Sequence, residues 1–550
     1  PTGTRVMGSC GLPLPGLTIR TDGGAVSGFL VPDLRFSESN GVEVSGSYYL
    51  RFADNRDLTL TTHVYTDAAP MVAGQWRHLT DSGAYQITGY ATHSQRISTL
   101  TGVSNSAEEF RGYIFANGKF QIAPDWSVTG SIRRTTDRTF LRRYDLSRDD
   151  RLRSTVELER VGKNTYFSLA GWATQTLRLD QPQGEVPLAL PVLDARWRPD
   201  EQILGGQLEL QANTLAITRD IGQDTQRAFA RAQWDLRRVT GMGQVVTLTG
   251  MLRGDVYHSD ENYLTSTASY RGNPGWEYRG VALGALDVQW PFVGEAFGGT
   301  QVFTPRVQFV ATPPIKNLAI PNEDARAIDL EDSNLFALNR FPGYDRVEDG
   351  ARVTYGFDWA LRIPDWELKT NVGQSYRLDS DRDILPVGTG LSERFSDFVG
   401  RTEVRYKDFL KFTHRFRLDK DNLAIRRNEI DATVGSRRTY AEIGYVRLDR
   451  DITQVEDLQD REELRGAVRV AFANYWSVFG SGVFNLTNRE EDPTLSSDGF
   501  DPIRTRLGIA YQDDCLELGV TWRRDYITSG DAERGDTFQF YFSLRNLGFR

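Results

Sequence analysis

The chain has 550 residues, of which 39% are hydrophobic, and its 65 basic and 74 acidic side chains give a formal net charge of −9. Because the two signs are interspersed, no basic stripe is available to neutralise a phosphate backbone, which argues against nucleic acid as a partner. No run of about 18 apolar residues occurs, so the sequence predicts no transmembrane helix.

The remaining composition favours strands. The chain has 51 glycines, 11% aromatic residues, 4 methionines and 2 cysteines, a balance typical of many strands joined by tight turns. A chain of this length ordinarily contains several domains, but a single large barrel also accommodates it. The composition favours the barrel.

Glycines and prolines are concentrated in residues 1–24, which indicates a connection rather than a helix or strand. We expect a domain to end just before this connection. Since no charged and apolar leader is present, either a signal peptide has been removed or the chain is a fragment of something longer, and we favour a fragment of a secreted precursor. Polar and apolar residues then alternate in residues 42–50 and 58–64, around a polar turn at 53–56, which predicts a β-hairpin.

The alternating unit recurs at the C-terminal end. Residues 506–511 and 516–523 alternate around a turn at 512–514, and residues 537–544 form an aromatic-rich closing strand. Such a closing strand is similar to the terminal assembly signal of outer-membrane barrels.

At about ten residues per strand and a similar number per connection, the chain after residue 25 holds about 26 strands. Two connections are expected to be much longer than the others, residues 180–202 with four prolines and residues 313–350. Loops of this length are usually functional. A soluble all-β repeat protein such as a propeller is the alternative, but no repeat near 40 residues with a recurring Trp-Asp pair is found.

Residues 322–350 and the strand after them organise the middle of the chain. Carboxylates, arginines, amides and a Pro-Gly pair predict a long ordered loop or inward fold at 322–350. From residue 352 the polarity alternates, so we expect one face toward lipid and one toward the lumen. The expected lipid-facing residues are Val353, Tyr355, Phe357, Trp359 and Leu361, and the expected lumen-facing residues are Arg352, Thr354, Asp358 and Arg362.

The sequence contains none of the standard catalytic motifs, and its five histidines are scattered one per segment. The dense carboxylates of residues 322–349 could bind a divalent cation or form an ion-pair network with nearby arginines, and we favour the network. An outer-membrane phospholipase is the enzyme alternative, but such enzymes need only a small barrel. We therefore predict no enzyme activity, no cofactor and no metal site.

Several short runs occur in the order in which one family of outer-membrane proteins carries them. The most specific is Asn-Arg-Phe-Pro-Gly-Tyr-Asp-Arg at residues 339–346. The other runs lie at residues 27–32, 48–49, 55–61, 290–292, 321–324, 332–336, 373–377 and 514–515. Over residues 25–550 the chain thus resembles the lipopolysaccharide-assembly protein family LptD, also called organic solvent tolerance protein.

The resemblance implies an all-β fold, a very large antiparallel transmembrane β-barrel of residues 25–550. Residues 1–24 would be the end of a periplasmic β-jellyroll and its linker. The implied function is that of an outer-membrane translocon, which receives lipopolysaccharide from a periplasmic bridge and inserts it into the outer leaflet through a lateral gate between the first and last strands. A large outer-membrane porin, or a receptor for solute uptake, is the alternative.

The resemblance also implies partners and a location. The partners are lipopolysaccharide, the plug lipoprotein LptE, the periplasmic bridge protein LptA and the barrel-assembly machinery. The location is the outer membrane of a Gram-negative bacterium, with the N-terminal side in the periplasm.

Family members often carry prolines in the first two strands, which weaken the seam because proline donates no ladder hydrogen bond. The matching positions here are Ser47 and Thr62, and Gly46 is a further weak point. We expect residues 42–50 to pair with residues 537–544 through few hydrogen bonds. The expected gate residues are Gly46, Ser47, Thr62, Phe538, Phe540 and Phe542.

Two further expectations accompany the resemblance. Family members often have paired cysteines near the C-terminus and two more on the N-terminal side, whereas this chain has only Cys10 and Cys515. Cys515 matches the C-terminal site, Cys10 has no secure counterpart, and we expect a disulfide between them in an exported chain, with two free thiols as the alternative. The expected luminal loop network comprises Asp332, Asn334, Asn339, Arg340, Tyr344, Asp345 and Arg346.

Overall fold

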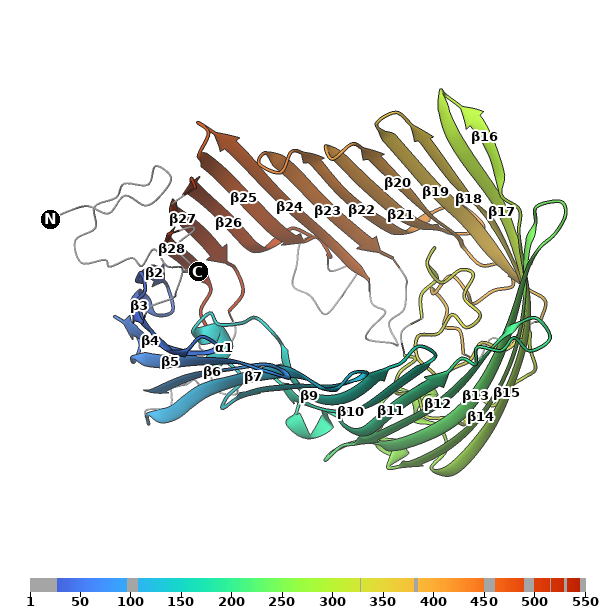
Figure 1. Ribbon diagram of the computed structural model, residues 1–550, viewed down its shortest axis with the longest axis horizontal. Coiled ribbons are helices and arrows are strands. Elements are labelled where there is room, and N and C mark those ends of the chain that lie inside the picture. Colours follow the sequence, from blue (N-terminus) through green and yellow to red (C-terminus); the bar gives the residue numbers. More distant parts are fainter. Residues whose placement is uncertain are drawn as a thin grey trace.

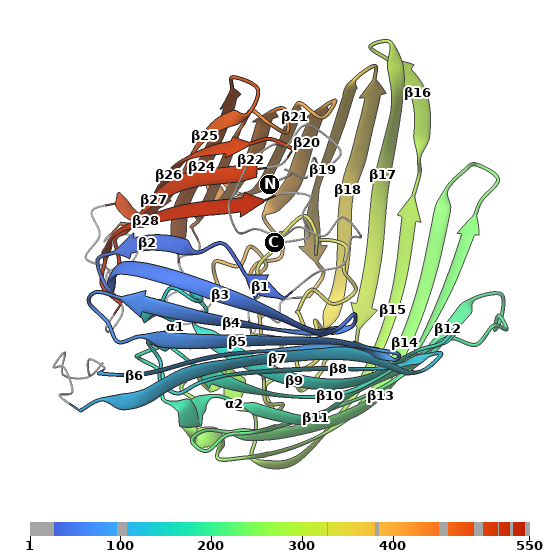
Figure 2. The same ribbon diagram turned by 60° about the vertical axis from the view of Figure 1, so that its left-hand side comes forward.

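The computed structural model describes residues 27–95, 107–326, 328–379, 384–449, 460–488, 499–514, 516–528 and 532–544. In these residues most of the chain lies in antiparallel strands of one continuous sheet. Figure 1 shows that the sheet closes into a wide ring, and Figure 2 shows the strands side by side along its wall.

The strands follow one another in chain order. The first fourteen are β1 (Gly28–Phe29), β2 (Asp33–Ser37), β3 (Gly41–Ala53), β4 (Arg56–Tyr65), β5 (Met71–Thr80), β6 (Gly83–Ser94), β7 (Glu109–Ala123), β8 (Trp126–Thr135), β9 (Arg151–Val161), β10 (Thr165–Thr176), β11 (Leu188–Trp197), β12 (Gln207–Thr218), β13 (Asp224–Val239) and β14 (Val245–Asp260).

The remaining strands are β15 (Gly275–Gln289), β16 (Phe292–Ala296), β17 (Gly299–Thr312), β18 (Gly350–Ile363), β19 (Trp366–Arg377), β20 (Phe398–Tyr406), β21 (Leu410–Leu418), β22 (Ile425–Gly435), β23 (Tyr440–Leu448), β24 (Arg461–Phe472), β25 (Trp476–Asn485), β26 (Asp501–Gln512), β27 (Leu516–Asp525) and β28 (Gly535–Leu544). Short helical pieces are α1 (Phe140–Arg143), α2 (Ala268–Arg271), η1 (Gln183–Glu185) and η2 (Asn262–Leu264). Neither α-helix of the described residues has the length and apolar character needed to cross a membrane.

Each strand pairs with its neighbour along the chain, and two strands are interrupted. β1 and β2 both pair with β3, and β15 and β16 both pair with β17. Counting each interrupted strand once gives a ring of 26 strands, which the pairing of β2 with β28 closes. The expected antiparallel barrel of about 26 strands is confirmed. Among the described residues, closure pairs β2 with β28 and so shortens the unpaired sheet edge, which a lipid environment would not tolerate.

The two ends of the barrel differ in the length of their connections. At one end, called here the short-turn end, β3–β4, β5–β6 and β7–β8 are joined by two residues each. At the opposite end, called the long-loop end, residues 136–150 join β8 to β9 and residues 313–349 join β17 to β18. Outer-membrane barrels usually have short periplasmic turns and longer extracellular loops.

β18 shows how the two faces of the wall differ. Arg352 donates hydrogen bonds inward to the carbonyl oxygens of Ala337 and Leu338, at 2.7 and 2.9 Å, and Thr354 on the same face is buried. Tyr355 lies on the opposite, outer face and is exposed. The two sets of side chains therefore lie on opposite faces of the wall, as the alternation predicts.

An arginine on the outer face of β18 should be far more costly than one on the inner face. Replacing Phe357 by Arg, near the middle of the strand, is expected to lower the free energy of unfolding by about 2 to 4 kcal/mol, because lipid cannot hydrate the charge. Ala360→Arg, on the inner face of the same strand, is the control and should cost less than about 1 kcal/mol. Denaturant titration in phospholipid vesicles measures both values, and equal losses would contradict the assignment of faces.

The expected long connection at residues 180–202 is wrong. The structure places β11 within it, paired with β10 and β12. Pro191 lies where both ladders shift register, between Ala189 and Val192. A bulge accommodates a residue that has no N–H to donate, so the prolines did not exclude a strand here.

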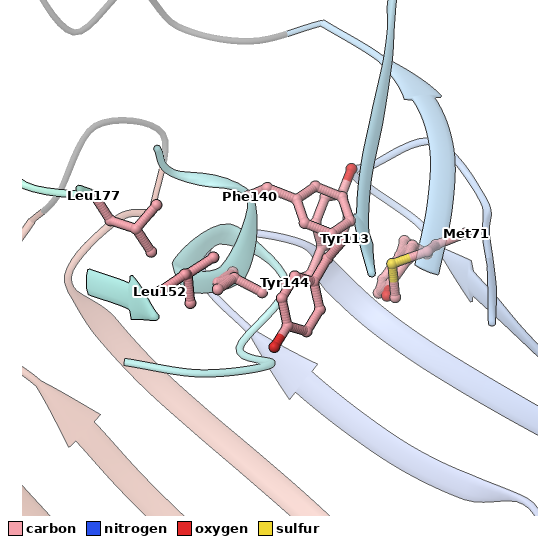
Figure 3. Packing of buried hydrophobic residues seen from close by; sticks show 8 residues of the cluster. Met71, Tyr113, Phe140, Tyr144, Leu152 and Leu177 are labelled. Atoms are coloured by element: carbon pink, nitrogen blue, oxygen red, sulfur yellow. The ribbon is translucent and has the colours of Figure 1, made fainter. Parts of the chain in front are cut away.

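A buried hydrophobic cluster surrounds α1 on the inner side of the wall (Figure 3). Phe140, Leu141 and Tyr144 come from the β8–β9 connection, and the other members come from β4, β5, β7, β9 and the end of β10. Those members are Tyr65, Met71, Tyr113, Leu152 and Leu177. The cluster fixes the β8–β9 connection against the wall.

Two expectations concern residues that the structure does not describe. The jellyroll remnant at residues 1–24 lies outside the described ranges, and so do Cys10 and Cys515 of the expected disulfide. Both expectations stay predictions.

Candidate functional site

The seam, where β2 and β28 close the ring, is the first part of the candidate site. These two strands form four register pairs, whereas β13 and β14 form sixteen. The four pairs are Leu34 with Phe540, Arg35 with Gln539, Phe36 with Phe538 and Ser37 with Thr537. At the long-loop end, the backbone N–H of Glu38 also donates to the carbonyl oxygen of Asp536 at 3.2 Å. The seam therefore has a short ladder.

β28 continues past this ladder toward the short-turn end, but β2 does not follow it. Tyr541, Phe542 and Ser543 pair with β27, and no other strand of the described residues gives them a register partner. Opposite them, the first strand is interrupted at residues 30–32, and β1 pairs with β3. Backbone pairing closes the seam only in the half nearer the long-loop end.

Pro32 lies at the interruption of the first strand. Proline has no N–H and a fixed φ, so it cannot donate to a ladder at this position. Just before it, the N–H of Leu30 still donates to the carbonyl oxygen of Ser47 on β3 at 2.8 Å. The first barrel strand thus contains a proline, upstream of the positions that the resemblance indicated.

The expected pairing of residues 42–50 with residues 537–544 is wrong. Residues 42–50 belong to β3, which pairs with β2 and β4. Gly46 and Ser47 therefore lie one strand away from β2, and Thr62, on β4, lies two strands away. The true first strand escaped the sequence analysis because β2 is only five residues long and follows a proline. The alternation of Leu34 and Phe36 with their polar neighbours was the signal that could have identified it.

Apolar side chains line the outer face of the seam. The rings of Phe36 and Phe538 lie 6.4 Å apart across it, centroid to centroid. Leu34 and Phe540, the next outward-facing pair, are exposed. Phe542 shares their face of β28, beyond the end of the ladder. The outer side of the seam is thus an apolar strip.

The second part of the site is the luminal segment, residues 313–349, which folds from the wall into the ring (Figure 1). Its described residues form no strand, in agreement with the predicted ordered loop. Two stretches of the segment bind each other through carboxylates. Asp324 accepts the backbone N–H groups of Tyr344 and Asp345 at 2.9 and 3.0 Å, and Asp345 accepts those of Glu323 and Asp324 at 2.7 and 3.1 Å.

Arginines on the inner face of the wall bind this part of the segment. Arg227 of β13 donates to Asp324 and Asp345 at 2.7 and 2.5 Å. Arg279 of β15 donates to the carbonyl oxygens of Asp345 and Tyr344 at 2.7 and 3.0 Å. Burial raises the pKa of Asp345, but attraction to Arg227 outweighs it and holds the pKa below its usual value. The segment is therefore attached to the wall by an ionised carboxylate.

Glu348 forms a second attachment, next to β18. It is buried, and it accepts a hydrogen bond from Nε of Arg340 at 2.7 Å. Arg352 and Arg377 of the wall lie 3.2 and 3.7 Å from its carboxylate oxygens. Burial would raise the pKa of Glu348, but attraction to Arg340 and Arg352 lowers it to about 2. One carboxylate thus holds three arginines.

Asn339 and Arg346 join these two attachments. Asn339 donates to the carbonyl oxygen of Arg346 at 2.9 Å and accepts the backbone N–H of Glu348 at 3.0 Å. Arg346 donates to the carbonyl oxygens of Ile320 and Ser269, both at 2.7 Å. The structure therefore brings together the predicted residues from Asn339 to Arg346 in one connected region.

Asp332 and Asn334 lie elsewhere in the segment. Asp332 is 3.4 Å from Nε of Arg401 on β20. The side chain of Asn334 accepts the backbone N–H of Glu331 at 2.9 Å and donates to the carbonyl oxygen of Asp329 at 2.7 Å. These two residues thus shape and attach the part of the segment that faces β20 to β22.

The wall arginines that hold the segment were not predicted from the sequence. Arg227, Arg253 and Arg279 lie on the inner faces of three consecutive strands, β13 to β15. Arginines at inward positions of otherwise apolar alternations were the available signal. Across the described ranges, no group of three or more His, Cys, Asp or Glu side chains is arranged to hold a metal ion.

Comparison with known proteins gives one family. Residues 109–476 match the family model described as LptD: LPS transport system D. The LPS-assembly protein LptD of Vibrio vulnificus is 23% identical, over 94% of this chain and 67% of that protein. The LPS-assembly protein LptD of a Polaromonas species is 26% identical, over 69% of this chain and 47% of that protein.

Similarity to solved structures is weak. The ferric enterobactin receptor of Pseudomonas aeruginosa aligns with 94% of this chain and 80% of that chain, at 9% identity and a TM-score of 0.33. A score this low carries no argument about shared function.

Proposed function

The chain belongs to the LptD family of LPS transport proteins, and on that premise we propose that it is an outer-membrane translocon for lipopolysaccharide. The molecule enters from a periplasmic bridge, its sugars pass through the lumen, and its lipid leaves sideways through the seam between β2 and β28. The single observation that carries this proposal is the four-pair ladder of the seam.

The energetics of the ladder support lateral exit. Each net backbone hydrogen bond contributes about 0.5 to 1.5 kcal/mol, so a ladder of four register pairs costs about 2 to 6 kcal/mol to open. The sixteen pairs of β13 and β14 would cost about four times as much. With each interrupted strand counted once, the ladder of β8 with β9 has six pairs and is the shortest of the others among the described residues, so opening costs least at the seam.

The surfaces on either side of the wall also suit a glycolipid. The outer strip of Leu34, Phe36, Phe538 and Phe540 offers apolar contact to acyl chains. The inner wall carries arginines that hydrogen-bond the luminal segment, and a polar inner face of this kind is compatible with sugars. Because the segment lies inside the ring, we propose that it sets the space left for the sugar chain (Figure 1).

The proposal includes partners and an orientation. By family membership, the periplasmic bridge protein LptA delivers the lipopolysaccharide, the lipoprotein LptE occupies the lumen, and the barrel-assembly machinery inserts the barrel. The short-turn end faces the periplasm, as does the N-terminal side, and the long-loop end faces outward.

A large porin or a solute receptor is the alternative function. Either would show the same alternation of polar and apolar faces. Neither function needs a closing ladder shorter than the ladders between other neighbouring strands, because solutes pass through the lumen and not through the wall. The seam therefore favours the translocon.

Depletion of the protein in its host tests the proposal. We expect newly made lipopolysaccharide to stop reaching the cell surface, with uptake of small hydrophilic solutes reduced by less than about twofold. Surface labelling of lipopolysaccharide measures its delivery, and the rate at which cells take up a radiolabelled sugar measures solute uptake. Loss of solute uptake with normal surface lipopolysaccharide would support a porin or receptor and refute the translocon.

A further inference from the structure

The β8–β9 connection (residues 136–150) extends from the wall to the seam on the inner side of the ring. Figure 1 shows its helix, α1, inside the ring of strands. The connection belongs to the long-loop end, where the seam ladder also lies. Each end of the connection is held by a different set of contacts.

One end of the connection is fixed to the wall away from the seam. Asp137 accepts two hydrogen bonds from Arg111 of β7, at 2.9 and 3.0 Å, and both side chains are buried. The same carboxylate accepts the backbone N–H groups of Thr139 and Phe140 at 3.1 and 2.9 Å. Phe140 and Tyr144 are buried in the cluster of Figure 3. Two independent sets of contacts therefore fix α1 in place.

The other end contacts both sides of the seam. Oδ2 of Asp145 lies 3.4 Å from Nη1 of Arg35 on β2 and 2.7 Å from Nη2 of Arg523 on β27. Arg148 donates to Asp525 of β27 at 2.5 Å. One carboxylate oxygen is thus shared by arginines on either side of the β2–β28 junction.

The backbone presents Asp145 toward the seam. Its φ is +53°, in the left-handed region that Asp and Asn tolerate better than most residues. Its N–H donates to the carbonyl oxygen of Arg142 at 3.2 Å, at the end of α1. Asn40, in the turn after β2, donates to the carbonyl oxygen of Arg143 at 2.9 Å. The end of α1 is thus joined to the first hairpin of the barrel.

These contacts are ion pairs that are partly exposed to solvent, which suits a reversible connection. Asp145, Arg35 and Arg523 keep 25%, 24% and 22% of their side-chain surface exposed. Partly exposed ion pairs are weaker than buried ones and are screened by salt. Since α1 is anchored on the β7 side, opening of the seam would break the contacts to β27 and keep the contact to Arg35.

We propose that the β8–β9 connection is a clasp that holds the seam shut at its long-loop end, with Asp145 as the shared carboxylate. The contacts of Asp145 with Arg523 and of Arg148 with Asp525 must be released before β28 can separate from β2. The biological purpose of the clasp rests on the proposed function, because it would control the exit of lipid. Its effect on the seam does not rest on that function.

The substitution Asp145→Asn tests the clasp. Asparagine keeps the size and the tolerance of positive φ, but it removes the charge that binds both arginines. In the full-length protein in phospholipid vesicles, we expect those backbone amides of residues 33–38 and 535–541 that point across the seam to exchange hydrogen for deuterium about threefold to tenfold faster. Exchange in β13 and β14, far from the seam, should stay within about twofold of the wild-type rate.

Asp149→Asn is the matched control. Asp149 lies in the same connection. It pairs with Arg133, which lies on β8, and with Ser147, which lies in the connection itself. We expect this variant to exchange at the wild-type rate in the seam. Raising the salt concentration should speed seam exchange in the wild type and in Asp149→Asn, and less in Asp145→Asn, in which the two contacts of residue 145 with arginines are already lost while that of Arg148 with Asp525 remains.

Three results would overturn the clasp. They are equal seam exchange in the two variants, an increase that is as large in β13 and β14 as in the seam, and an unchanged salt dependence in Asp145→Asn. If Asp145→Asn does not assemble, Arg523→Gln removes the shorter of the two contacts and is expected to give the same local increase. Its failure to do so would equally refute the clasp.

The experiment separates the clasp from the proposed function. Hydrogen exchange reports opening of the seam without any lipopolysaccharide. Faster seam exchange in a protein whose depletion leaves surface lipopolysaccharide normal would establish the clasp and refute the translocon. Normal seam exchange in a protein that does deliver lipopolysaccharide would refute the clasp alone.

Discussion

A disulfide between Ser37→Cys and Thr537→Cys is expected to stop delivery of lipopolysaccharide to the cell surface. The two positions are register partners on β2 and β28, within the four-pair ladder. A covalent bond across this ladder cannot be broken by the few kcal/mol that separate open and closed seams. We expect surface delivery to fall more than tenfold in the oxidised protein and to recover when reductant is added.

The control is the same change at Ser131 and Thr155, register partners on β8 and β9 whose hydroxyl oxygens lie 3.1 Å apart. This disulfide crosses a ladder that stays closed in the proposed mechanism, so delivery should be unchanged. Both native cysteines are retained in both variants. Normal delivery by the oxidised Ser37→Cys and Thr537→Cys protein would show that lipid does not leave through this seam.

Replacing Glu348 by Gln should detach one side of the luminal segment from the wall. The buried carboxylate holds Arg340, Arg352 and Arg377, and its loss removes the counter-charge of Arg340 and Arg352, whereas Arg377 keeps its ion pair with Asp379 at 3.2 Å. Removing one partner of a buried ion pair costs about 3 to 5 kcal/mol. We expect amide exchange of residues 339–349 to accelerate at least a hundredfold and proteases to cut the segment in the folded barrel.

Glu331→Gln is the control for this substitution. Glu331 lies in the same segment and pairs with Arg427 at 2.9 Å, but about a third of its side chain is exposed. Solvent therefore replaces much of the lost interaction, and the cost should be below about 1 kcal/mol. Similar exchange rates in the two variants would mean that Glu348 does not hold the segment.

The attachment of the luminal segment to the wall should weaken as the pH falls. The pKa of Glu348 falls from 4.5 to about 2 on folding, so its ionised form contributes stability that is complete above pH 4.5. That contribution, about 3 kcal/mol, is lost as the pH falls from 4.5 toward 2. The protection factors of residues 339–349, which are corrected for the slower intrinsic exchange at low pH, should therefore fall over this range in the wild type. In Glu348→Gln their fall should be much smaller.

Several conclusions followed from the sequence by itself because they depend on local properties. Strand alternation is set by the pleat, which points successive side chains to opposite faces, so residues 352–362 could be divided into inner and outer sets without a structure. The same periodicity and the spacing of turns predicted an antiparallel barrel and its approximate number of strands. The run at residues 339–346 indicated the family.

The exact position of the seam could not be read from the same pattern. Alternation fixes which way a side chain points but not which strand lies beside it, and ring closure joins Leu34 to Phe540 across almost the whole chain. Residues 42–50 were therefore predicted as the first strand, and β2 was not recognised. The prolines at residues 180–202 led to the wrong prediction of a long connection. Only the ladders with the neighbouring strands reveal that Pro191 lies in a bulge.

The tertiary structure also decided which charges meet. Asp345 binds Arg227, 118 positions earlier, and Asp145 binds Arg523, 378 positions later. The ion-pair partner of a carboxylate cannot be identified from the sequence, because attraction between charges depends on distance in space and on burial. The sequence determined the wall of this protein and the faces of that wall. Folding of the ring determined where the wall closes and which arginines hold its inner segments.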